Sequence, residues 1–175
     1  MDRAIADKCP VPVILYNVPG RTGTNIQAET LLSLAQHPNI IGVKEASGNI
    51  TQAMRLVKDK PDDFLLISGD DMLLVPLMAI GAIGVISVLA NAFPEVFRNT
   101  INHCRAGRYP EASAEALKLF DLNPLMYEEG NPVGIKQVLH ELNICSNQVR
   151  LPMAEASERH QVNIRRALAE LMAHH

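Results

Sequence analysis

The stretch that decides the fold reads Ile40-Ile41-Gly42-Val43-Lys44-Glu45-Ala46-Ser47-Gly48-Asn49. Its apolar first half is too short for a helix, and a run of this kind indicates a strand buried on both faces. The segment Ser47-Gly48-Asn49 before the apolar Ile50 indicates the start of a helix. Lys44 is therefore predicted at the carboxyl end of a buried strand, which is where α/β folds place their chemistry.

Lys44 admits two interpretations. The first is a surface ion pair with the neighbouring Glu45, and the second is an amine held neutral for carbonyl chemistry. Adjacent residues on a strand point to opposite faces, so these two side chains are not expected to neutralise each other easily. Both interpretations stay open on this stretch alone.

Strand-like and helix-like segments alternate on both sides of this stretch. Strands are expected at residues 11–16, 40–44, 64–68 and 84–89, and helices at residues 2–8, 27–36, 50–58 and 72–80. This alternation predicts βα units, a parallel sheet and right-handed crossovers. None of the four strands alternates polar with apolar residues, so helices are expected to cover the sheet.

The pattern changes to helices only in the last part of the chain. After a helix that opens at Pro94 and ends near Gly107, further helices are expected, two of them starting at Asn131-Pro132 and Ser157. We therefore expect a strand–helix region over residues 1–107 and an all-helical region over residues 108–175. Four βα units fit either an incomplete open sheet or half of an eight-unit barrel, because a complete barrel takes about 250 residues. The helical beginning favours a truncated barrel.

Composition narrows the classes of function. The chain has 175 residues, 47% of them hydrophobic, and a net charge of −3, which is typical of a soluble globular protein. Basic residues are scattered and aromatics make up only 4%, so neither nucleic acid nor a membrane is expected as a partner. Three widely spaced cysteines without a Cys-x-x-Cys pair indicate reduced thiols in the cytoplasm and give no support to zinc.

The loops after the expected strands carry the candidate site residues, which are Tyr16, Arg21, Lys44, Gly69-Asp70-Asp71 and Ser87. A buried lysine amine that loses its charge attacks a keto group to form an imine, which is an electron sink. The Tyr16 phenol could pass protons, although a lone tyrosine is more often a core residue. Arg21 offers a planar fork for a carboxylate, although a lone turn arginine is more often a surface residue.

Two other motifs favour structural interpretations. Asp70 and Asp71 precede a helix, where acids more often cap the helix than bind a metal, so no metal is expected. The segment Ser47-Gly48-Asn49 is more often an ordinary helix cap than a phosphate cradle.

Four motifs together resemble one family. They are Tyr16-Asn17-Val18-Pro19-Gly20-Arg21-Thr22-Gly23, Gly42-Val43-Lys44-Glu45-Ala46-Ser47-Gly48-Asn49, Ser68-Gly69-Asp70-Asp71 and Gly84-Val85-Ile86-Ser87-Val88. In order and spacing they are similar to the 4-hydroxy-tetrahydrodipicolinate synthase (dihydrodipicolinate synthase) family. The resemblance implies an α/β fold, a (β/α)₈ TIM barrel of which this chain supplies strands five to eight, followed by the C-terminal helices.

The resemblance also implies a reaction and the residues that serve it. Lys44 would form a Schiff base with pyruvate, Tyr16 would relay protons, and Arg21 would bind the carboxylate of aspartate semialdehyde. Gly69 and Ile86 would shape the pyruvate pocket. The implied reaction condenses pyruvate with aspartate 4-semialdehyde on the route to diaminopimelate and lysine, needs no cofactor, and takes place in a homotetramer.

The sequence departs from the family in two respects. Gly20 stands where the family carries serine, and the family's Gly-Thr-Thr-Gly-Glu segment, second tyrosine and feedback lysine site belong to a first half that this chain lacks. We therefore expect weak or no synthase activity from this chain alone, with strand edges and barrel-interior apolar residues left uncovered. The alternatives are a sibling aldolase, similar to N-acetylneuraminate lyase or a 2-keto-3-deoxy sugar acid aldolase, and a non-catalytic fragment.

Overall fold

The computed structural model describes residues 2–173, which fall into two compact units. The first unit ends at Ser87 and the second begins at Val88. The expected boundary at residue 107 marks a different property, the end of the strand–helix repeat, and it stays a prediction.

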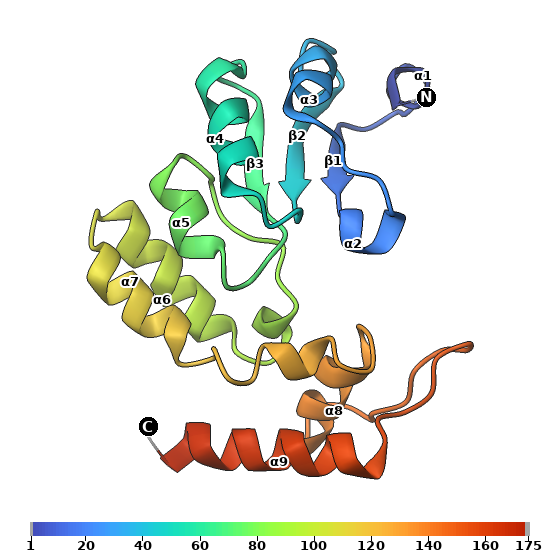
Figure 1. Cartoon of the computed structure of the whole chain (residues 1–175), viewed down its shortest axis with the longest axis vertical. Coiled ribbons are helices and arrows are strands. Elements are labelled where there is room, and N and C mark those ends of the chain that lie inside the picture. Colours follow the sequence, from blue (N-terminus) through green and yellow to red (C-terminus); the bar gives the residue numbers. More distant parts are fainter. Residues whose placement is uncertain (1, 174–175) are drawn as a thin grey trace. The chain divides into compact units, whose positions relative to one another are not determined.

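The first unit is built on a parallel sheet with the strand order β1-β2-β3 (Figure 1). Its elements in chain order are α1 (Asp2–Ala6), β1 (Val13–Asn17), α2 (Pro19–Thr22), α3 (Ala28–Leu34), β2 (Ile40–Glu45), α4 (Ile50–Asp59), β3 (Leu65–Ser68) and α5 (Leu74–Ala79). The expected alternation of strands and helices and the parallel sheet are confirmed. The segment after β1, expected as a loop, contains the one-turn helix α2, because Pro19 presets the backbone for a helical first turn.

The expected fourth strand at residues 84–89 is wrong as a full strand. Val85 forms a single parallel bridge with Ser68, supported by hydrogen bonds from Ser68 N to Gly84 O (2.8 Å) and from Ile86 N to Ser68 O (2.9 Å). The segment therefore follows β3 for only a few residues. The physical reason is that β3 itself has only four residues and offers a short ladder to pair with.

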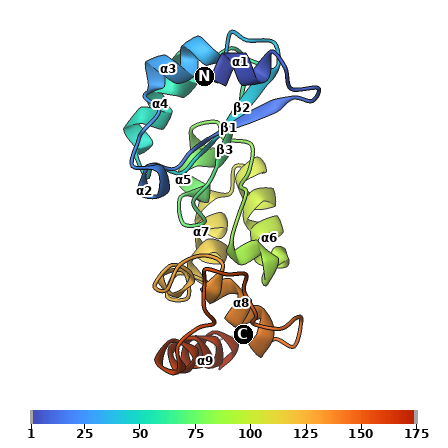
Figure 2. The ribbon, with the colours of Figure 1, turned by 90° about the vertical axis from the view of Figure 1, so that its right-hand side faces the viewer.

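One face of the sheet is packed under helices. Leu15 of β1, Val43 of β2 and Leu66 of β3 join a buried cluster with side chains from the helices. The helical members of this cluster include Leu31, Leu34, Ala53, Leu56 and Leu77. Figure 2 shows α3 and α4 on this side of the strands. Removal of this apolar surface from water is the main source of stability for the unit.

The opposite face is open at β1, whereas Ile67 of β3, which pairs with Lys44 on that face, is only 8% exposed. Ile14 is 40% exposed, Tyr16 is 50% exposed, and Ile86, next to the sheet, is 45% exposed. The expectation that helices cover the sheet is therefore wrong for this face of β1, where Ile14 and Tyr16 stay exposed. The expectation of uncovered barrel-interior residues stays a prediction.

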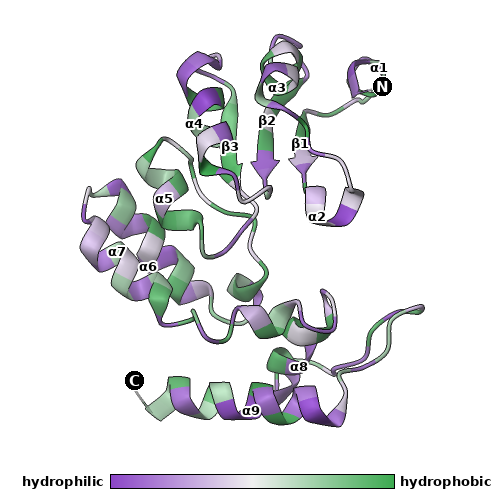
Figure 3. Ribbon diagram, viewed as in Figure 1, coloured by the Kyte–Doolittle hydropathy of each residue, from purple (hydrophilic) through white to green (hydrophobic). Residues whose placement is uncertain are grey.

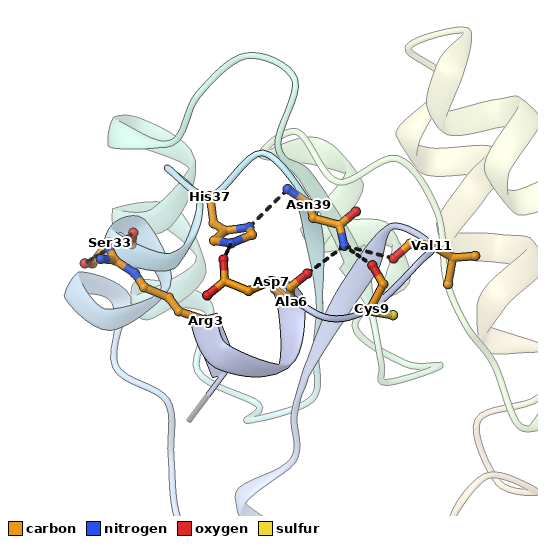
Figure 4. Close-up of polar contacts among 8 residues, drawn as sticks. All are labelled: Arg3, Ala6, Asp7, Cys9, Val11, Ser33, His37 and Asn39. Carbon is orange, nitrogen blue, oxygen red and sulfur yellow. Dashed lines mark hydrogen bonds and ion pairs between the residues drawn. The ribbon is translucent and has the colours of Figure 1, made fainter.

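The amino-terminal end of the sheet is tied to α1 by side chains (Figure 4). Asn39 Nδ2 donates to the carbonyl oxygens of Ala6 (2.9 Å), Cys9 (2.9 Å) and Val11 (3.1 Å). Nearby, His37 Nε2 lies 3.0 Å from Asp7 Oδ1. The Asn39 amide thus supplies a donor to three carbonyl groups at and after the end of α1.

Between Val88 and Ala173, the second unit contains helices and loops but no strand. They are η1 (Leu89–Asn91), α6 (Pro94–Arg105), α7 (Tyr109–Leu117), η2 (Pro124–Met126), α8 (Val133–Glu141) and α9 (Glu158–Ala173). The expected cap before α9 is confirmed, because Ser157 Oγ accepts from His160 N at 3.3 Å. Ser157 also donates to Glu129, and these bonds hold the pKa of the Glu129 carboxyl below its ordinary value. Across residues 2–173, no helix is long and apolar enough to cross a membrane.

Candidate active site

Lys44 and Tyr16 lie side by side at the carboxyl ends of β2 and β1. The parallel register pairs Tyr16 with Lys44, so both side chains emerge on the open face of the sheet. The Lys44 Nζ atom lies over the Tyr16 ring, 4.2 Å from its centroid. An ammonium over an aromatic face is attracted by the ring, and this contact orients the amine.

Gly69 closes the next side of the site. Its amide donates to Glu45 O at 2.7 Å, which brings the loop after β3 against the end of β2. A Cβ atom at position 69 would lie 2.7 Å from Ala46 Cβ and 3.1 Å from Lys44 Cε. Glycine is therefore required for the loop to approach the lysine stem this closely.

Ile86 and Arg21 lie around the site and are both exposed. Ile86 is bonded through its amide to Ser68 O and is half-exposed, which puts it beside the carboxyl end of β3. Arg21 is exposed on α2, the short helix that follows β1. The structure thus places Lys44 against both Tyr16 and Gly69, whereas Arg21 is exposed on α2 and is not shown in contact with them.

The acidic and glycine-containing motifs have structural roles. Asp70 Oδ1 accepts from Met72 N (2.9 Å) and Leu73 N (3.3 Å), so it caps the turn before α5. Asn49 Oδ1 accepts from Gln52 N (3.0 Å), which is an N-cap for α4. The capping prediction is confirmed for Asn49, whereas Asp70 bonds only the turn before α5, whose N-cap Leu73 has no side-chain cap bond. Residues 2–173 contain no group of three His, Cys, Asp or Glu side chains placed to hold a metal ion.

Glu45 does not pair with Lys44. Its carboxylate lies on the covered face, where Asn17 Nδ2 donates to Oε1 (3.1 Å) and Oε2 (3.0 Å), and Ser47 N donates to Oε1 (2.6 Å). Gln52 Nε2 is a further donor at 3.4 Å. The interpretation of Lys44 and Glu45 as a surface ion pair is therefore wrong.

Sequence reasoning missed this buried polar cluster. A signal for it was present, because Asn17 and Glu45 each come directly after an expected strand that is otherwise apolar on the same face. Buried polar groups need partners, so two polar residues at equivalent ends of adjacent parallel strands indicate a mutual hydrogen bond. The register that makes them equivalent is a tertiary property, which the sequence does not display.

The arrangement suits carbonyl chemistry. Polar residues gather where the apolar strands end, as Figure 3 shows at the tips of β1 and β2. There an amine from Lys44 and a phenol from Tyr16 lie within reach of one small molecule. An amine that attacks a keto group needs a nearby acid and base to move protons as water leaves, and a phenol meets that need.

Comparisons with known proteins agree with this geometry. The profile of the Dihydrodipicolinate synthetase family matches residues 2–171. The 4-hydroxy-tetrahydrodipicolinate synthase of Cytophaga hutchinsonii is 52% identical over 155 residues, which cover 89% of this chain and 52% of that protein. The chain thus spans about half the length of the curated relatives that it matches.

Solved structures match over nearly the whole chain. The chloride-inhibited dihydrodipicolinate synthase of Acinetobacter baumannii, complexed with pyruvate, is similar with a TM-score of 0.93 at 34% identity, covering 98% of this chain and 59% of that one. The DHDPS of Cyanidioschyzon merolae, solved with lysine bound, has a TM-score of 0.92 at 36% identity, with coverages of 98% and 58%.

Proposed function

This chain belongs to the dihydrodipicolinate synthetase family, and from that premise we propose that it carries the Schiff-base machinery for condensing pyruvate with aspartate 4-semialdehyde. The product is 4-hydroxy-tetrahydrodipicolinate, and the reaction serves diaminopimelate and lysine biosynthesis. The contact between the Lys44 amine and the Tyr16 ring is the observation that carries the proposal.

Lys44 is the nucleophile of this reaction. Its neutral amine attacks the keto carbon of pyruvate, and loss of water from the carbinolamine leaves an imine between Nζ and that carbon. The imine withdraws electrons, so the adjacent methyl carbon loses a proton and becomes the nucleophile toward the aldehyde. The Tyr16 hydroxyl relays protons to and from the carbinolamine oxygen.

Three further residues bind a substrate or shape the pocket. The Arg21 guanidinium binds the carboxylate of aspartate semialdehyde in a two-pronged contact. The bare backbone at Gly69 leaves room beside the Lys44 stem for pyruvate, and Ile86 supplies an apolar wall. Two observations support these roles. Gly69 closely approaches Lys44, and Arg21 and Ile86 are exposed at the carboxyl ends of the strands.

The sheet corresponds to the second half of a (β/α)₈ barrel, strands five to eight, with the segment through Val85 in the place of the last strand. The open face, with Ile14 and Tyr16 exposed, supports this assignment, because that face would line the interior of a closed barrel. In the complete fold we propose a homotetramer.

The test is the mass of the intact protein after incubation with pyruvate and borohydride, with Lys44→Ala as the control. Borohydride reduces the imine to a stable secondary amine, so one adduct of pyruvate is expected on the chain and none on Lys44→Ala. An unmodified, folded chain would contradict the proposal. An adduct of equal yield on Lys44→Ala would show that another amine reacts with pyruvate.

A further inference from the structure

We propose that Glu45 is a positioning residue. From the covered face of the sheet, its carboxylate holds the base of the loop that carries Arg21 in one conformation. This inference rests on the proposed function for the role of Arg21, and it adds a residue to which neither the family motifs nor the open-face geometry assigns a part. Lys44 and its neighbour Glu45 would then serve the two substrates from opposite faces of one strand.

The surroundings of the Glu45 carboxylate are the first step. The residue is 3% exposed, and its oxygens accept from Asn17, Ser47 and Gln52, all of which are neutral donors. A buried carboxylate is costly unless it is fully hydrogen-bonded, and bonds to a charged acceptor are stronger than neutral ones. The carboxylate therefore fixes the orientation of the two side-chain amides that donate to it.

Those two amides hold the far end of the Arg21 loop. Asn17 Oδ1 accepts from Ile26 N at 2.9 Å, and Asn17 Nδ2 also donates to Asn25 Oδ1 at 2.8 Å. Gln52 Nε2 donates to Ile26 O at 3.1 Å, and Gln52 Oε1 accepts from Asn25 Nδ2 at 2.8 Å. Asn25 and Ile26 are thus bound on both sides by amides that Glu45 orients.

The near end of the loop is held at the same place. Asn17 O accepts from Ala46 N at 2.8 Å, so the residue that ends β1 is bonded to the chain just after Glu45. Residues 18–25, which include α2 and Arg21, therefore form a loop closed at its base by Asn17 and Asn25. Within it, Thr22 Oγ1 donates to Thr24 O at 2.9 Å, which stiffens the turn after Arg21.

A carboxylate is required at position 45 because it only accepts hydrogen bonds. A glutamine there would direct an N–H₂ group at a donor, either Asn17 Nδ2 or Ser47 N. One amide would have to turn, and Asn17 would then lose its bond to Asn25 or to Ile26. The loop would loosen at its base while Lys44, on the opposite face, keeps its contact with Tyr16.

Trypsin reports on this loop directly, because it cleaves after Arg21. We expect native-state cleavage of the full-length Glu45→Gln chain at Arg21 to accelerate about 10-fold, the factor that corresponds to about 1.4 kcal/mol. Cleavage after Arg55 and Lys58, within α4, is the internal reference and should stay unchanged. An unchanged rate at Arg21 would overturn the proposal.

A further variant keeps the test sharp if Glu45→Gln loosens the whole unit. Asn25→Ala removes the partner at the loop end without touching the buried carboxylate, and it should also accelerate cleavage at Arg21 selectively. An unchanged cleavage rate in Asn25→Ala would show that the cluster does not hold the loop.

Asp70→Asn is the matched control, because it also converts a carboxylate at a strand end to an amide, but outside the cluster. It should leave cleavage at Arg21 unchanged, and acceleration there would overturn the specific role of Glu45.

The same proteins are then treated with pyruvate and borohydride. If the wild type forms no adduct, the proposed function fails, whereas the cleavage rates still decide the role of Glu45.

Discussion

The two faces of the sheet differ sharply although the same three strands build both. On the covered face, Val43 and Leu66 are fully buried, whereas on the open face Ile14 is 40% and Tyr16 is 50% exposed. Composition does not separate the faces, since both contain large apolar residues. The difference lies in the helices, which cover one side. The covered face supplies stability, and the open face presents the residues proposed for chemistry.

Glu45 and Lys44 show the same contrast between adjacent residues. Glu45 is surrounded by hydrogen-bond donors on the covered face, whereas Lys44 has an aromatic ring beside it on the open face. A buried carboxylate with several donors is held in one orientation. The half-buried Lys44 amine is oriented by a single aromatic ring. Variants on each face test this contrast.

The largest effect on stability is expected from a truncation on the covered face. Leu66→Ala leaves a cavity in the buried cluster and should lower the free energy of unfolding by about 2–5 kcal/mol. The matched change on the open face, Ile14→Ala, should cost about 1 kcal/mol or less, because that residue is already 40% exposed. Urea denaturation followed by far-UV circular dichroism measures both. Equal losses would show that the open face is packed in solution.

An intermediate effect on stability is expected at Gly69, in the loop after β3 that packs against the carboxyl end of β2. Gly69→Ala places a methyl group against Ala46 and the Lys44 stem, which should cost about 1–3 kcal/mol and lower the yield of the pyruvate adduct. Gly20→Ala is the control, since no atom lies within 4 Å of a Cβ there. It should be neutral or stabilise by up to about 1 kcal/mol. A full adduct yield on Gly69→Ala would mean that Gly69 does not shape the site.

The smallest effect on stability is expected from Tyr16→Phe on the open face. The ring that faces Lys44 is retained, so the free energy of unfolding should change by no more than about 0.5 kcal/mol. Loss of the hydroxyl should slow formation of the borohydride-trapped pyruvate adduct by about 100-fold. The time course of adduct mass measures this rate. A wild-type rate in Tyr16→Phe would remove the hydroxyl from the proton relay.

The local elements and the two residues proposed for chemistry, Lys44 and Tyr16, could be predicted from the sequence. The apolar run ending in Lys44, the helix caps at Asn49 and Ser157, and the parallel order of strands all follow from short-range patterns. The prediction of the fourth strand was wrong because strand formation needs a partner of sufficient length, and β3 offers only a short ladder.

Sequence patterns are enough to locate three of the strands and most of the helices, because apolar periodicity, capping residues and turn formers act within a few residues of the chain. Tertiary packing is needed to settle which face of the sheet is covered and that Asn17, Glu45 and Gln52 share one hydrogen-bonded cluster. Those outcomes depend on strand register and helix placement, which bring together groups far apart in the chain. The same register aligns Lys44 with Tyr16, so residue identity supplies the reactive groups and tertiary packing supplies their proximity.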